Sequence, residues 1–136
     1  MQQPLNLPAL VRALIVTAVV SVSVPVFAAA APIVFASWGG TTQSAQQKEW
    51  AVPFTQASGV QVLMDGPTDY GKLKAMVDSG NVQWDVVDVE GDFAYAALRD
   101  GLVEPIDYSV VNKSQLDPRF MSPGAVGSFY YSFVLG

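Results

Sequence analysis

The sequence contains no cysteine and no histidine among its 136 residues, and only 14% of its residues carry a charge. Without cysteine, no disulfide bond can stabilise the fold, whichever compartment the protein occupies. Without histidine, the chain lacks the commonest general base, the commonest zinc ligand and every nucleophile that is paired with a histidine. We therefore expect no cofactor, no metal ion and no catalytic activity of those kinds.

Basic residues are also scarce. Arg12 is the only charged residue before Lys48, and residues 31–136 hold six basic residues against twelve acidic ones, which gives a net charge of −6. A surface of this sign repels nucleic acid and tolerates cations. We therefore expect no nucleic-acid partner.

The first thirty residues have the layout of a secretory signal peptide. Arg12 precedes an apolar segment, residues 13–24, which Pro25 then interrupts. Small residues satisfy the cleavage rule after Ala28 and after Ala30. We predict a signal peptide over residues 1–30 and a periplasmic location for the mature chain. The alternative is an uncleaved membrane anchor, because the segment is only slightly shorter than the about 20 apolar residues of a membrane span.

After this leader, short apolar segments alternate with helical patterns. Strands are expected at residues 33–36, 60–64 and 84–89, and helices at residues 43–57, 70–78 and 93–99. This alternation predicts βαβ crossovers and a mostly parallel sheet, and therefore an α/β fold.

Several side chains are expected to mark the ends and breaks of these elements. Thr41 or Thr42 can cap the first helix, Pro53 weakens its middle, and Asp69 can cap the second helix. The proline-containing segment 102–124 can hold little more than a turn or short helix near residues 114–120. Residues 128–135 then form a strongly strand-like segment.

The chemistry of this chain is expected in the loops that follow the strands. In an open parallel sheet, ligands bind beyond the carboxyl ends of the strands. The loops there present Trp38 followed by Gly39, then Tyr70, and then the acidic residues Glu90 and Asp92. An aromatic face beside carboxylates suits an organic ammonium group, because the ring and the anion both attract it. The competing interpretation makes Trp38 a packing residue and the acids helix caps.

Three other uses of these residues follow from the pattern. A calcium-binding loop starting at Asp88 is excluded. Phe93 occupies the position of the sharp-turn glycine, and Arg99 occupies the position of the bidentate acid. A secreted hydrolase could use Asp88 and Glu90 as its acid and base. A ferric-ion or other cation carrier could use the phenolates of residues 130–131, although neighbouring residues of a strand point to opposite faces, which would make one of them core.

The order and spacing of five segments resemble the periplasmic polyamine-binding proteins of spermidine and putrescine importers. The segments are residues 33–40, 65–73, 84–90, 101–107 and 128–131. The resemblance implies a periplasmic-binding-protein-like lobe of type II, incomplete, with residues 31–136 forming the first of two lobes and ending before the second. It also implies a monomer that closes over a polyamine and delivers it to an ABC permease in the inner membrane.

The same resemblance implies roles for individual residues. Trp38 would stack on the methylene chain of the ligand, with Gly39 and Thr41 lining the same loop, and Glu90 and Asp92 would lie in the second loop of the cleft. The family often presents hydroxyl groups rather than acids in that second loop. Because closure needs contacts from both lobes, we expect this chain alone to bind polyamine weakly or not at all.

Overall fold

The computed structural model describes residues 30–132 and 134–135 of the chain. Three strands, β1 (Ile33–Ala36), β2 (Val62–Asp65) and β3 (Val86–Val87), form a parallel sheet in the order β2-β1-β3. The predicted α/β fold with a parallel sheet is therefore confirmed. The predicted signal peptide, its cleavage sites and the alternative membrane anchor fall almost wholly on residues 1–29, which lie outside the described residues.

The third strand is much shorter than predicted: backbone bonds from the Asp85 and Asp88 amides to β1 flank it, but a side chain replaces one bond of the ladder at its start. The Asp85 carboxylate accepts a hydrogen bond from the Val34 amide at 2.8 Å, so a side chain takes the place of a strand carbonyl. The neighbouring Trp84 is buried in the core. Regular pairing is thus limited to the two residues that lie opposite Phe35 and Ala36.

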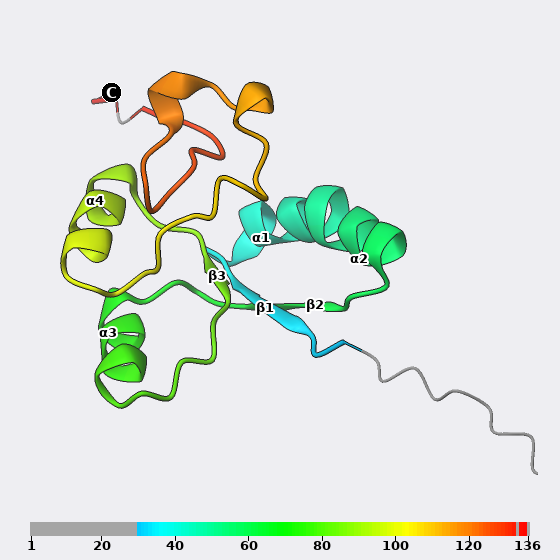
Figure 1. Cartoon of the computed structure of the whole chain (residues 1–136), viewed down its shortest axis with the longest axis horizontal. Coiled ribbons are helices and arrows are strands. Elements are labelled where there is room, and N and C mark those ends of the chain that lie inside the picture. Colours follow the sequence, from blue (N-terminus) through cyan, green and yellow to red (C-terminus); the bar gives the residue numbers. More distant parts are fainter. Residues whose placement is uncertain (1–29, 133, 136) are drawn as a thin grey trace, which may run out of the picture.

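A single helical run follows β1 and covers one face of the sheet (Figure 1). It consists of α1 (Gly40–Gln46), the π-helical turn η1 (Gln47–Ala51) and α2 (Val52–Ser58). The prediction that Thr41 or Thr42 caps it was wrong, because the helix begins earlier, with Gly39 as its N-cap and both threonines inside it. Pro53 does not break the run: it lies in the first turn of α2, directly after the π-helical turn η1, where the regular α-helical bonding pattern is already interrupted.

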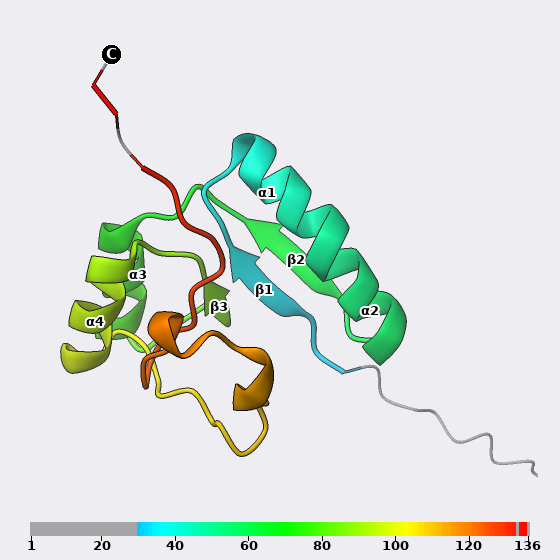
Figure 2. The same ribbon diagram turned by 90° about the horizontal axis from the view of Figure 1, so that it is seen from above.

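Two further helices, α3 (Tyr70–Asp78) and α4 (Gly91–Arg99), cover the opposite face of the sheet (Figure 2). The predicted cap of α3 is confirmed, since the Asp69 carboxylate accepts a hydrogen bond from the Lys72 amide. Between these helices and the sheet lies the hydrophobic core, which is formed by Ala36, Leu73, Met76 and Trp84.

The chain after α4 has little regular structure. The short helical segment expected near residues 114–120 is confirmed as two single turns, η2 (Lys113–Gln115) and η3 (Pro118–Phe120). The strand expected at residues 128–135 is not formed in residues 128–132 or 134–135. Its β propensity is not enough, because a strand needs a hydrogen-bonded neighbour and none of the three described strands pairs with it. In the part of the chain that the structure describes, no helix combines the length and the apolarity that a bilayer crossing requires.

Asp65, the last residue of β2, connects the sheet to the core tryptophan. Its carboxylate accepts hydrogen bonds from Trp84 Nε1 at 2.6 Å and from Lys72 Nζ at 3.0 Å. The Trp84 bond first, and the Lys72 bond second, lower the pKa of Asp65 to about 2. Asp65 is thus a structural anion, and its carboxylate is committed to protein groups.

The substitution Asp65→Asn is expected to destabilise the fold in a pH-dependent manner. Because the folded pKa lies below the unfolded one, the ionised carboxylate contributes stability above about pH 4 and loses it as the pH falls towards 2. We expect a loss of about 1 kcal/mol at pH 7, a value that allows for solvent screening of a side chain that is 40% exposed. Urea denaturation followed by tryptophan fluorescence at pH 7, 4 and 2 would measure this.

The matched control is Asp78→Asn, which removes the exposed ion pair with Lys74. This substitution should change the free energy of unfolding by less than about 0.5 kcal/mol. A difference between wild type and Asp65→Asn that stays constant from pH 7 to pH 2 would contradict the role given to the Asp65 charge.

Candidate functional site

The loops that follow the three strands are tied together at one edge of the sheet. The Thr68 amide donates a hydrogen bond to the Ser37 carbonyl at 2.8 Å, and the Thr68 hydroxyl donates one to the Asp88 carbonyl at 3.0 Å. The approach at Gly66 is so close that a Cβ atom there would lie 2.5 Å from the Ser37 carbonyl oxygen. The loops containing Trp38, Tyr70 and Glu90 are therefore held side by side.

Three aromatic rings form one wall of this site. Tyr70 stacks on Phe93 with ring centroids 3.7 Å apart and planes at 6°, and it meets the Trp38 ring edge-on at 6.3 Å. The Tyr70 hydroxyl oxygen accepts a hydrogen bond from the Glu90 amide at 3.0 Å. Partial burial, as the largest cause, raises the pKa of Tyr70, so the phenol is neutral at physiological pH. We call Trp38, Tyr70 and Phe93 the aromatic wall.

The acidic residues beside the wall differ in what they can do. Glu90 is half-buried at the start of α4, and its Oε2 accepts a hydrogen bond from the Tyr131 hydroxyl. Within the described residues, its other oxygen, Oε1, has no hydrogen-bond partner. Asp92 is exposed, and its carboxylate accepts a hydrogen bond from the amide of Phe93. Glu90 is thus the acid whose backbone is bonded to the aromatic wall and whose carboxylate has an oxygen that can accept a further hydrogen bond.

Asp88 belongs instead to a buried polar network beneath the site. The Gln46 amide nitrogen donates to Asp88 Oδ2 at 2.7 Å, and the Ser37 hydroxyl donates to the Gln46 side-chain oxygen. Ser37 is 0% exposed and Gln46 is 4% exposed. Burial, as the largest cause, raises the pKa of Asp88, and the hydrogen bonds from Gln46 and then Ser128 counteract part of that rise. The network joins the loop after β1, helix α1 and the loop after β3.

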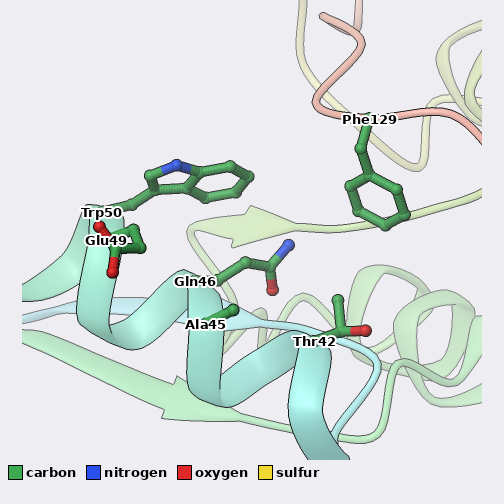
Figure 3. A pocket seen from close by; sticks show the side chains of 6 residues that line it. All are labelled: Thr42, Ala45, Gln46, Glu49, Trp50 and Phe129. Atoms are coloured by element: carbon green, nitrogen blue, oxygen red, sulfur yellow. The ribbon is translucent and has the colours of Figure 1, made fainter.

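An open, largely apolar groove of about 330 Å³ runs along the helical run next to this network (Figure 3). Gln46 and Trp50 project from the helical run on one side of the groove, and Phe129 faces them from the C-terminal segment. Trp50 also stacks on Phe35 of the sheet, with ring centroids 6.4 Å apart. Gln46 is therefore shared between the groove and the buried network.

The structure brings together most, but not all, of the residues expected to contact a ligand. Trp38, Tyr70 and Glu90 meet at one site, and Gly39 adjoins it as the N-cap of α1, with a φ of 80° that favours glycine. Thr41 lies in the first turn of α1 and is exposed.

Sequence reasoning missed the stacking role of Phe93, the network residues Ser37 and Gln46, and the contact of Tyr131 with Glu90. Phe93 had one usable signal, since it lies three residues after Glu90 at the start of the same expected helix. The other three gave none: Gln46 and Tyr131 have partners about forty residues away, and no local pattern marks the bond between Ser37 and Gln46.

The two adjacent tyrosines do not form a pair of metal ligands. Tyr131 bonds to Glu90, whereas Tyr130 stacks on Phe120 with ring centroids 6.3 Å apart. The expectation that one of them is core was wrong, because they are 85% and 51% exposed. Among the residues that the structure describes, no group of three or more acidic, cysteine or histidine side chains could hold a metal ion.

The chain is similar in sequence and structure to known substrate-binding proteins. A solved GABA receptor structure matches with 61% sequence identity and a TM-score of 0.72, over 75% of this chain and 32% of that protein. The gamma-aminobutyric acid-binding protein of Pseudomonas aeruginosa is 35% identical over 101 residues, which are 73% of this chain and 29% of that protein. The chain is homologous to periplasmic substrate-binding proteins of ABC transporters.

Further comparisons agree with this homology. A substrate-binding protein of Agrobacterium tumefaciens solved with agropinic acid is 45% identical, with a TM-score of 0.67, over 71% of this chain and 31% of that protein. No protein-family model matches the chain. The chain spans about a third of the length of these substrate-binding proteins. The homology confirms the expected periplasmic location.

The hydrolase alternative finds no support in these relatives, since the homologues are substrate-binding proteins and not enzymes. The raised pKa of Asp88 has a structural cause, because its carboxylate is partly buried in a network where it accepts a hydrogen bond from Gln46. A general acid in a hydrolase must instead be within reach of a bound substrate.

The substitution Gln46→Leu is expected to cost about 1–3 kcal/mol of folding free energy. The leucine fills a similar volume but leaves the buried Ser37 hydroxyl without its acceptor and the Asp88 carboxylate without its amide donor. The control is Gln47→Leu, at the next, exposed position of the same helical run, which should change stability by less than about 0.5 kcal/mol. Thermal and urea unfolding would measure both variants, and equal effects would contradict the network.

Proposed function

We propose that this chain supplies one lobe of a periplasmic solute-binding protein that binds a small organic ammonium compound, an ω-amino acid of the GABA type, for delivery to an ABC permease. The observation that carries the proposal is the aromatic wall with Glu90 beside it, since the Glu90 backbone N–H donates a hydrogen bond to the Tyr70 hydroxyl. An ammonium group is attracted both to the faces of such rings and to the anion.

The number of available acids favours an ω-amino acid over a polyamine. Asp65 is committed to Trp84 and Lys72, and Asp88 to Gln46. Of the remaining acids, Glu90 adjoins the aromatic wall and can receive one ammonium group, whereas Asp92 is exposed and bonds to the Phe93 amide. A polyamine, which the resemblance of the sequence suggests, carries at least two ammonium groups and would need a further anion.

The carboxylate of an ω-amino acid has a complementary feature near Trp38. The helical run begins directly after Gly39, which makes no side-chain capping bond, and the first-turn amides include that of Thr41. Unsatisfied N–H groups at the start of a helix favour an anion. The two GABA-binding relatives support the same ligand class. Asp92, exposed at the rim, would add to the negative potential that attracts the ammonium group.

An NMR titration of the chain with GABA, putrescine and spermidine would test this proposal. We expect GABA to bind more tightly than either polyamine, with a dissociation constant of about 1 mM or weaker, because one lobe supplies only part of the contacts. Tighter binding of putrescine or spermidine would favour the polyamine alternative. Micromolar affinity for any of the three would contradict the expectation that one lobe alone binds weakly.

The substitution Trp38→Leu should weaken GABA binding by about 2- to 30-fold, which corresponds to the loss of one cation–π contact. The control is Trp50→Leu, which removes a tryptophan from the groove beside the helical run and not from the aromatic wall. It should leave GABA affinity unchanged. Equal losses in the two variants would refute the assignment of the aromatic wall as the ligand site.

A further inference from the structure

The C-terminal segment, residues 128–132, crosses the candidate site. Its first residue, Ser128, lies close enough to Asp88 to offset part of the rise that burial causes in the pKa of that carboxylate, and the Tyr131 hydroxyl donates a hydrogen bond to Glu90. These contacts join positions about forty residues apart, and neither contact belongs to the sheet or to the hydrophobic core. The segment therefore acts on both acids of the loop after β3, although it forms no regular secondary structure.

Glu90 is held at two points by tyrosines from different parts of the chain. The Tyr70 hydroxyl receives its backbone N–H at 3.0 Å, and the Tyr131 hydroxyl donates to its side-chain Oε2. A glutamate side chain has three rotatable bonds, and ordering it on ligand binding costs affinity. A carboxylate that is already held before the ligand arrives avoids that cost.

We propose that Tyr131 is a positioning residue for ligand recognition: its hydroxyl holds Oε2 of Glu90 so that Oε1 is presented to the ammonium group of the ligand. This inference rests on the proposed function and names the residue that prepares its site. Tyr131 itself need not touch the ligand. Its neighbour Tyr130, which stacks on Phe120, has no such role.

The experiment is a double-mutant cycle with Tyr131→Phe, Glu90→Gln and the double variant, read by NMR titration with GABA. We expect Tyr131→Phe to weaken GABA binding about three- to tenfold and to leave the melting temperature unchanged, because Tyr131 is 51% exposed. In the Glu90→Gln background, the same substitution should have little further effect. The matched control, Tyr130→Phe, should bind GABA like the wild type.

A second measurement tests the hydrogen bond between Tyr131 and Glu90 in the absence of ligand. The hydrogen bond to Glu90 is the main cause that raises the pKa of Tyr131 to about 12, so the phenol signal should titrate nearer 10 in Glu90→Gln. Tyrosine ring carbon NMR follows this titration, and Tyr130→Phe removes the neighbouring signal.

The outcomes separate the two claims. A wild-type chain that binds GABA while Tyr131→Phe binds equally well overturns the positioning role alone. The role is also overturned if the loss in Tyr131→Phe persists in full in the Glu90→Gln background, or if the Tyr131 titration does not move. A wild type that binds neither GABA nor a polyamine overturns the proposed function, and the positioning role with it.

Discussion

The parallel pairing of β1 with β2 and β3 is the constraint on which the site depends. Because all three strands run in the same direction, their carboxyl ends, and the loops that follow, meet at one edge of the sheet. Trp38 follows β1, Tyr70 follows β2 and Glu90 follows β3. An antiparallel neighbour would have sent one of these loops to the opposite edge. The aromatic wall and its carboxylate exist only because the register brings these three loops together.

Polar contacts join the loops of the site to one another and to helix α1. Ser37, Gln46 and Asp88 form a buried chain of hydrogen bonds directly under the loops, and Thr68 joins the loops to one another. Among the described residues, no buried side-chain nitrogen or oxygen is without a hydrogen-bond partner. A fully satisfied network of this kind fixes loop positions, because each group that moved would leave another unsatisfied in a region of low dielectric.

The carboxylates of the chain have different roles because their surroundings and hydrogen-bond partners differ. Asp65 is ionised and anchors Trp84, Asp69 caps α3, and Asp88 is partly buried in the polar network. Glu90 is bonded to Tyr70 through its backbone N–H and has one carboxylate oxygen unengaged within the described residues. A count of carboxylates in the loops therefore overstates the charge available to a ligand. This is the physical reason to favour a ligand with one ammonium group.

The sequence by itself determined the α/β class, the first strand, helix α3 with its Asp69 cap, and the loops in which the site lies. These features depend on residues close together in the chain, through hydrophobic periodicity and local hydrogen bonds. Only the tertiary structure decided that Asp85 shortens β3, that residues 128–132 stay unpaired, and that Gln46 and Tyr131 reach Asp88 and Glu90. Those contacts join residues roughly forty or more positions apart, and no local pattern records a partner at that separation.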